Sequence, residues 1–325
     1  MTAVSGRDAF GKALLELAEQ NEKVVALTAD LAEAIRVHWF AEQYPERFFQ
    51  IGIAEQDMIG TAAGLAMTGW IPFATTFAVF AANRANEQIR MAVCYNEANV
   101  KIAVSHGGIT PGEDGATHQG LEDIAAMRLM PGMTVVVPAD ADETRLATFA
   151  AAELHGPVYL RLGRLPFPTV TDRAEQPFVI GKARTLRSGT DVSLIACGIM
   201  VGMAWEASER LQREGISASV IDMHTIKPID REAILSEARK TGCIVTAEEH
   251  SVLGGLGGAV AEVLTEHEPV PLVRVGTMDT FGESGEPMAL LAKYGLTPEA
   301  IVEAAKTAIQ KKRTGGEQLV RGSFA

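Results

Sequence analysis

Short apolar runs alternate with helix-period stretches along the first half of the chain. The runs are rich in β-branched residues and cover residues 24–30, 71–78, 100–106, 133–139 and 157–162. Continuous apolar runs separated by helical segments are typical of a parallel sheet with helices on both faces. The pattern therefore predicts a doubly wound, mostly parallel α/β domain over residues 1–170.

The same rhythm returns after a stretch of prolines and charges at residues 164–181, which we interpret as a linker. Further apolar runs cover residues 192–198, 216–222, 243–249 and 271–276. They predict a second, smaller doubly wound α/β domain over residues 178–313. Its last helix is expected to begin with Thr297 as the cap and Pro298 at the first helical position. Residues 314–325 are expected to form a disordered tail.

Composition is that of an ordinary globular protein, with 47% hydrophobic and 22% charged residues. A net charge of -12 argues against a nucleic-acid or membrane surface, since both attract basic faces. The three cysteines are far apart and lack metal-type spacing, which favours a reducing compartment. The N-terminus predicts an amphipathic helix opened by Ser5, with no signal-type apolar segment, and no apolar run could span a bilayer. These features predict a cytoplasmic protein.

Glu55 is the first candidate for chemistry. It follows an apolar run and opens a helix pattern, so it is either a first-turn acid that complements the helix dipole or a functional carboxylate. Its neighbours are mostly apolar, and a carboxylate buried among them needs a hydrogen-bond donor. The residue types alone leave these two interpretations evenly matched.

A glycine-rich loop at residues 105–120 carries a dense polar cluster. Its side chains include His106, Asp114 and His118, and its five glycines would let the backbone pass close to a ligand. Because ligands of parallel α/β sheets gather at the carboxyl ends of strands, this loop is a candidate site. The alternative is a solvated surface loop.

Aromatic and basic side chains precede this loop. Phe77 and Phe80 lie three residues apart and are either core residues or a cofactor platform. Arg84 and Arg90 continue the same helix pattern and are candidates to face an acid or a phosphate.

Two further arginines, Arg161 and Arg164, lie at the end of the last strand of the first series. Guanidinium groups there suit a phosphate or a carboxylate, with surface ion pairs as the alternative. The glycine-rich turn within residues 248–264 lacks the third glycine of a dinucleotide loop, so we interpret it as a packing turn. His224 and His250 are interpreted as structural.

Six segments together resemble thiamine-diphosphate enzymes of the transketolase family, over nearly the whole chain. Three segments resemble the pyrimidine-binding domain of these enzymes, namely FFQIGIAEQDMIGTAAGLA (48–66), TTFAVFAANRANEQIR (75–90) and GITPGEDGATHQGLEDIAAMRLMPGMTVVVPAD (108–140). Three more segments resemble the C-terminal domain of these enzymes, namely IDMHTIKPID (221–230), TAEEHSVLGGLGGAVAEVL (246–264) and FGESGEPMALLAKYGLT (281–297). The GEDGATHQ loop is the most specific of these motifs.

The resemblance implies the C-terminal (beta) subunit of a split transketolase. Transketolases hold the diphosphate of thiamine diphosphate through Mg²⁺ in an N-terminal domain, whose motif this sequence lacks. An N-terminal partner subunit is therefore implied as the carrier of Mg²⁺, with self-association as a beta dimer within an α2β2 assembly. The implied reaction transfers a two-carbon ketol unit from a ketose phosphate to an aldose.

The resemblance also implies roles for the cofactor residues. The acid matching Glu55 hydrogen-bonds a ring nitrogen of the aminopyrimidine and favours the tautomer that deprotonates the thiazolium. Phe77 and Phe80 match the aromatic wall on the pyrimidine, although Asn83 stands where transketolases carry a further aromatic side chain. Asp30 matches a position near the cofactor and the subunit interface.

For the substrate, His106 and His118 match histidines near the reacting carbonyl and hydroxyls, where they are implied proton carriers. Asp114 matches an acid that contacts a substrate hydroxyl. Arg164 matches the arginine that binds the substrate phosphate, whereas Arg161 fits the pattern of 1-deoxy-xylulose-phosphate synthases. No metal-binding residue is implied in this chain.

Other functions share the same fold and the same acid. One is the beta subunit of a 2-oxo acid dehydrogenase, although such subunits usually lack GEDGATHQG, and another is an enzyme like 1-deoxy-xylulose-phosphate synthase. A third is a non-catalytic interaction subunit that has kept the fold.

Overall fold

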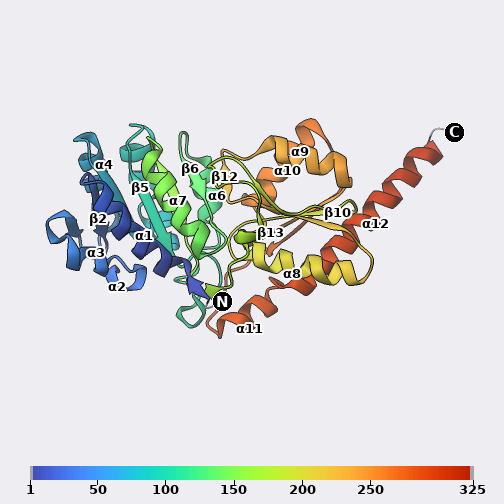
Figure 1. The fold of residues 1–325 in the computed structure, drawn as a ribbon, viewed down its shortest axis with the longest axis horizontal. Helices are drawn as coiled ribbons and strands as arrows, with labels where there is room; N and C mark the ends of the chain where they lie inside the picture. The colour runs from blue at the N-terminus through green and yellow to red at the C-terminus, as the bar shows by residue number, and fades with distance from the viewer. Residues whose placement is uncertain (1–2, 323–325) are drawn as a thin grey trace.

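The computed structural model describes the backbone of residues 3–322 and the side chains of residues 3–314. Two α/β domains lie side by side, with the start of the chain near their junction (Figure 1). The last helix, α12 (Pro298–Gly322), extends away from the second domain (Figure 1).

The first domain is built on a seven-stranded sheet of order β12-β6-β7-β5-β4-β2-β3. Every neighbouring pair is parallel except β12 with β6. The strands are β2 (Val24–Thr28), β3 (Phe48–Gln50), β4 (Ile71–Phe77), β5 (Lys101–Ser105), β6 (Thr134–Val136), β7 (Val158–Arg161) and β12 (Thr225–Lys227). One face is covered by α1 (Gly6–Gln20) and α7 (Ala141–Glu153), and the other by α4 (Glu55–Met67) and α6 (Asp123–Leu129).

Local signals explain where these helices begin. The Ser5 hydroxyl accepts a hydrogen bond from the backbone N–H of Asp8 at 3.2 Å and caps α1, as the sequence predicts. Asp140 caps α7 in the same way, through the N–H of Glu143 at 3.0 Å. The buried face of α1 carries Phe10, among other apolar residues, against the sheet and α7.

The second domain is built on a five-stranded sheet of order β14-β13-β10-β11-β9, in which only β9 is antiparallel. Its strands are β9 (Arg184–Arg187), β10 (Val192–Ala196), β11 (Ala218–Asp222), β13 (Ile244–Ser251) and β14 (Leu272–Thr277). Helices α8 (Met200–Arg213) and α12 pack on one face, and α9 (Arg231–Thr241) and α10 (Leu256–His267) on the other.

Shorter elements connect these layers. They are β1 (Val4–Ser5), α2 (Ala32–Ile35), α3 (His38–Gln43), η1 (Pro45–Arg47), η2 (Phe80–Arg84), α5 (Asn86–Gln88), η3 (Ile89–Cys94), η4 (Gly112–Asp114), β8 (Pro166–Phe167), η5 (Thr171–Arg173) and α11 (Pro287–Lys293). Strand β1 pairs with β8, so the start of the chain is tied to the beginning of the linker.

The two domains share structure across their boundary. Strand β12 follows the second-domain strand β11 in sequence but pairs with β6 at the edge of the first sheet, where Thr225 lies opposite Val136. One apolar core contains Ile102 and Tyr159 from the first sheet as well as Ile195 from the second. The domains therefore form one continuous packed unit.

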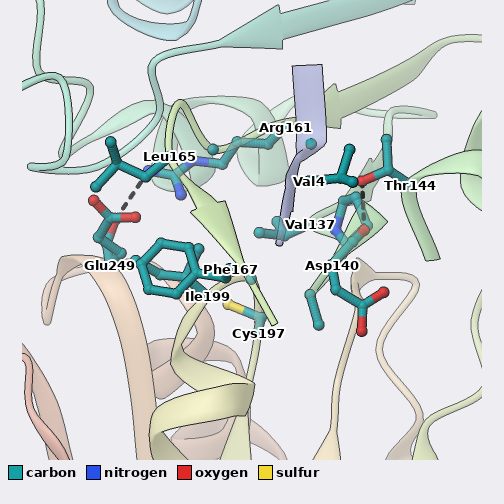
Figure 2. A pocket seen from close by; sticks show the side chains of 15 residues that line it. Val4, Val137, Asp140, Thr144, Arg161, Leu165, Phe167, Cys197, Ile199 and Glu249 are labelled. Atoms are coloured by element: carbon teal, nitrogen blue, oxygen red, sulfur yellow. Dashed lines mark hydrogen bonds between the residues drawn. The ribbon is translucent and has the colours of Figure 1, made fainter. Parts of the chain in front are cut away.

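A buried polar network reinforces this seam. The Arg161 guanidinium donates to both carboxylate oxygens of Asp123, at 2.8 and 3.1 Å, and to the carbonyl oxygens of Gly120 and Glu249. Figure 2 shows Arg161 reaching Glu249 of the second domain beside a small pocket lined by both domains. Burial alone would raise the pKa of Asp123, but the charge and hydrogen bonds of Arg161 lower it below its usual value.

All nine predicted apolar runs contain strands, and the prediction of two mostly parallel α/β domains is confirmed. The sequence predicts a disordered tail from residue 314, whereas the helical backbone of α12 continues to Gly322. Residues 315 and 316 are glycines, which weaken a helix but do not remove a backbone donor as proline would. The rest of the predicted tail, residues 323–325, lies outside the described residues.

Replacing Asp123 by alanine should lower the free energy of unfolding by roughly 3–5 kcal/mol, because it leaves the buried Arg161 charge without its partner. Urea denaturation followed by circular dichroism would measure this loss. The matched control is Asp172→Ala, which breaks an exposed pair with Arg173 and should cost less than about 1 kcal/mol. Equal losses in the two variants would contradict the assigned importance of the buried pair.

Candidate functional site

The candidate residues gather at the carboxyl edge of the seven-stranded sheet. Strands β2, β3, β4, β5 and β7 are adjacent and parallel, so the segments that follow them meet at one edge. Register places Phe77 at the end of β4 opposite Ser105 at the end of β5, directly before His106. Glu55 opens α4 after β3, and Arg164 follows β7.

Glu55 is a buried carboxylate held by a side chain, and it does not cap its own helix. Its side chain is only 1% exposed, and Arg84 Nη1 donates to both of its oxygens at 3.0 Å. Ala54 occupies the cap position of α4 and offers no side-chain acceptor, while Asp57 is the exposed acid of the first turn. The structure therefore gives Glu55 the donor that a buried carboxylate needs.

Arg84 reaches Glu55 from a π-helical turn. The turn η2 closes with a hydrogen bond from the N–H of Ala85 to the carbonyl of Phe80 at 3.2 Å. Phe80 and Arg84 share one face of this turn, and the guanidinium carbon lies 4.9 Å from the centre of the Phe80 ring. Such turns are frequent at functional sites, and sequence periodicity alone does not reveal them. The prediction that Arg84 faces an acid is confirmed.

Four aromatic and imidazole rings continue the site away from Glu55. Phe77 is buried and stacks on His106, with ring centres 3.8 Å apart, and on Phe80 at 5.7 Å. The ring centre of His118 lies 5.4 Å from that of Phe80 and 6.0 Å from that of Phe77, in edge-on arrangements. Phe80 is half-buried, so it offers more open ring surface than Phe77 does.

His106 is positioned as a neutral imidazole. It follows β5 with a left-handed backbone (φ 61°), and its Nδ1 lies 2.8 Å from the Ser105 hydroxyl. Burial, together with the charges of Arg7 and Arg164 and with His118, lowers its pKa from 6.5 to about 3. At neutral pH His106 can therefore donate or accept one hydrogen bond without carrying a charge.

At the far end of the site, two arginines line one pocket with acidic neighbours. Arg164 Nη1 lies 3.5 Å from Glu113 and 3.6 Å from Asp114. Arg7 lines the same pocket, donates to the carbonyl of Ala34 at 3.0 Å, and has a buried Nε without a partner in the described structure. The prediction from sequence missed Arg7, because nothing in a first helical turn distinguishes it from a surface arginine.

The second domain supports the loop that carries His106 and His118. The buried carboxylate of Glu249 accepts the backbone N–H of Thr110 at 2.7 Å. Gly108 has φ of +89°, and a Cβ there would overlap the Glu249 carboxyl group. Gln119 donates to the carbonyl of Glu283, in the segment before α11. Gly108 thus permits close packing between the loop and the second domain.

Two predicted site residues are placed differently from the others. Arg161 is buried and donates to Asp123 and to backbone carbonyls at the domain seam, and its contact with a substrate stays a prediction. Asp30 is exposed at the end of β2 with a left-handed backbone (φ 61°), and its N–H donates to Gln50. Asp30 therefore lies at the correct edge of the sheet, and its role in cofactor binding stays a prediction.

Asn83, which replaces an expected aromatic side chain, is exposed and donates to Glu122 at 2.7 Å. Among the described side chains, those of residues 3–314, no group of three or more metal-ligating residues is positioned to hold a metal ion. Over residues 3–322, no helix combines the length and apolarity needed to cross a bilayer.

Both halves of the sequence match transketolase domains. Residues 2–169 match the transketolase pyrimidine-binding domain, and residues 181–301 match the transketolase C-terminal domain.

Individual relatives align over almost their full length. The chain is 47% identical to the 6-deoxy-6-sulfo-D-fructose transketolase subunit SqwH of Clostridium sp. (strain MSTE9), over 94% of this chain and 95% of that protein. It is 42% identical to one subunit of the apulose-4-phosphate transketolase of Phocaeicola vulgatus, over 95% and 98%. A solved structure described as a split gene transketolase, inactive beta4 tetramer, is 53% identical with a TM-score of 0.88, covering 95% of this chain and 99% of that chain.

Acid should destabilise the protein partly through His106. Its pKa is about 3 when folded and near 6.5 in an unfolded chain, so the unfolded state binds more protons between these values. The free energy of unfolding should therefore fall as pH drops from 6.5 to 4, by up to about 1.4 kcal/mol per pH unit for this group.

His106→Asn should reduce that slope, since asparagine tolerates the left-handed backbone and does not titrate. Urea denaturation at a series of pH values would measure the slope, with His155→Asn, at an exposed position, as the control. The same slope in wild type and His106→Asn would rule out the buried neutral imidazole.

Proposed function

This chain belongs to the transketolase family, and we propose that it is the beta subunit of a two-subunit transketolase that transfers a two-carbon ketol unit. The family depends on thiamine diphosphate. The proposal assigns the pyrimidine end of the cofactor to this chain, and the diphosphate and Mg²⁺ to an N-terminal partner subunit. It rests on the matches of residues 2–169 and 181–301 to the family's pyrimidine-binding and C-terminal domains, and on relatives that are themselves described as transketolase subunits.

The observation that carries the proposal is the pairing of Glu55 with an aromatic face. A buried carboxylate and the half-buried ring of Phe80 are joined by one planar cation that contacts both. An aminopyrimidine is likewise planar and presents N–H donors at its edge, so the same two groups suit it. When bound, the cofactor supplies the carbanion-stabilising thiazolium, and the protein supplies orientation and electrostatics.

Glu55 would then accept a hydrogen bond from a pyrimidine ring nitrogen. Because its carboxylate is shielded from water, that bond is stronger and better oriented than an exposed one. Phe77, locked between His106 and Phe80, fixes the ring that would lie against the cofactor. Glu55 and Phe80 are the cofactor contacts of this chain, and Phe77 supports them from behind.

His106 and His118 lie beyond the aromatic rings, on the side towards the two arginines. The neutral imidazole of His106 would hydrogen-bond the substrate carbonyl or a hydroxyl. His118 is half-buried and contacts Thr117 through Nδ1 at 2.9 Å, which leaves it placed to exchange a proton with the substrate. Asp114 would contact a substrate hydroxyl.

Arg164 and Arg7 would bind the terminal anionic group of the sugar. Two guanidinium groups on one pocket suit a phosphate, which accepts paired hydrogen bonds. The relatives' names include a sulfo sugar and a sugar phosphate, and both substrates end in an anionic group. We therefore assign the substrate class as ketoses with a terminal phosphate or sulfonate.

The proposed assembly contains two copies of each subunit, with the beta subunits forming a dimer. The solved relative described as an inactive beta4 tetramer supports both beta-subunit self-association and the need for a second kind of subunit. Mixing this chain with an N-terminal transketolase subunit, thiamine diphosphate and Mg²⁺ should produce ketol transfer that neither subunit shows alone.

Replacing Glu55 by glutamine should lower the turnover of the assembled enzyme by at least about 100-fold, because the side chain keeps its size but loses its charge. The measurement is the rate of ketol transfer to an aldose at saturating cofactor. Asp57→Asn is the matched control, since Asp57 is an exposed acid in the same helical turn. Its effect should stay within about 3-fold, the size of a helix-dipole contribution.

Similar losses in the Glu55 and Asp57 variants would show that Glu55 is only a first-turn acid. Full activity of Glu55→Gln would remove its assigned role altogether.

Arg164→Ala should lower kcat/KM for a ketose phosphate by about 10- to 100-fold, the equivalent of a lost charged hydrogen bond. The loss should be much smaller for the same ketose without its phosphate. Arg173→Ala, which changes an exposed arginine paired with Asp172, serves as the control. Equal losses on both substrates would place Arg164 outside the phosphate site.

A further inference from the structure

Arg84 contacts the two groups that the proposed function assigns to the pyrimidine. Its Nη1 donates to both oxygens of Glu55, and its guanidinium lies over the Phe80 ring. A guanidinium is flat, delocalised and edged with N–H donors, and it stacks on aromatic faces. In these respects it matches the aminopyrimidine ring.

The geometry at Glu55 makes the two contacts mutually exclusive. A single nitrogen equidistant from both oxygens, at 3.0 Å, occupies the open side of the carboxylate between them. A ring nitrogen would approach a carboxylate oxygen from the same side while its ring covers Phe80. Both places are taken by one arginine, so the ring and the guanidinium compete for them.

We propose that Arg84 is an internal stand-in for the aminopyrimidine, which the cofactor must displace from Glu55 and Phe80. The proposal rests on the proposed function and concerns how this chain's own residues set the affinity for the cofactor. Arg84 is thus a residue that tunes cofactor binding, and it lies outside the reacting atoms.

The position of Arg84 makes displacement feasible. Its side chain is 50% exposed, whereas its partner Glu55 is 1% exposed. In the described part of the chain, its only ion-pair partner is Glu55, so the guanidinium can swing into solvent without breaking a second pair. Once it leaves, Glu55 is an unpaired buried carboxylate, which needs a new donor. The pyrimidine N–H supplies that donor.

Competition from Arg84 should measurably lower the apparent affinity of the complex for thiamine diphosphate. When only a fraction of the molecules has an accessible site, the apparent dissociation constant is the intrinsic one divided by that fraction. If Arg84 covers Glu55 about nine-tenths of the time, the apparent affinity for the cofactor is about 10-fold weaker than that of the open site. Removing the arginine side chain would recover this factor.

The test measures binding of thiamine diphosphate with Mg²⁺ to the complex of this chain with its N-terminal partner, using calorimetry at fixed pH and salt. Arg84→Ala should bind the cofactor about 5- to 10-fold more tightly than wild type. Arg90→Ala is the matched control, because Arg90 is exposed on the next π-helical turn and its side chain makes a single hydrogen bond in the described structure, to Met91. It should bind within about 2-fold of wild type.

A double-mutant cycle identifies the partner through which Arg84 acts. In a Glu55→Gln background the ion pair is already lost, so adding Arg84→Ala should tighten binding far less than it does in wild type. Thermal unfolding of each complex checks that the variants fold.

The outcomes separate this inference from the proposed function. If Arg84→Ala binds thiamine diphosphate as wild type does or more weakly, the proposed role of Arg84 is overturned and the enzyme assignment stays intact. The same holds if Arg84→Ala tightens binding equally in the wild-type and Glu55→Gln backgrounds. Absence of cofactor binding in wild type and in every variant overturns the proposed function and the stand-in together.

Discussion

The ion pair between Arg161 and Asp123 is the constraint on which the rest of the site depends. Both side chains are buried, and Arg161 also donates to carbonyls of Gly120 and Glu249, which belong to different domains. Burial of two charges is unfavourable unless they are paired and hydrogen-bonded, and here Tyr159 also donates to Asp123. The network therefore fixes the end of the glycine-rich loop against the second sheet.

The two domains contribute different groups to the candidate site. The first domain provides the groups placed to contact ligands, while the second provides their support, through Glu249 at Thr110 and through the segment before α11 at Gln119. A loop with many glycines would be mobile on its own. Packed between two sheets, it holds His106 in a left-handed backbone conformation, stacked on Phe77. Support from the second domain is the physical reason that a glycine-rich loop can keep one conformation here.

The sequence predicted the repeating features well and the local exceptions poorly. Apolar runs located nine strands, because burial on both faces of a parallel sheet leaves a continuous signal. Strand β12 was missed, since a three-residue edge strand contributed by the other domain has no pattern of its own. Residue type alone does not distinguish Arg161 from Arg164, because both lie at the end of a strand until packing buries Arg161 against Asp123 and leaves Arg164 partly exposed. Arg7 is not predicted, because nothing in a first helical turn distinguishes it from a surface arginine.

The two ends of the site differ in how firmly they are held, and this difference follows from which residues cover them. His106 is enclosed by Phe77, by Ser105 and by the loop that the second domain supports. Glu55, by contrast, is covered on its open side by Arg84, a half-exposed arginine on a π-helical turn. A group covered by a half-exposed side chain can change partners at smaller cost than one enclosed by packed rings. The end with the exchangeable cover is therefore the end suited to a ligand that must enter and bind, and the enclosed end suits a group that must keep its position.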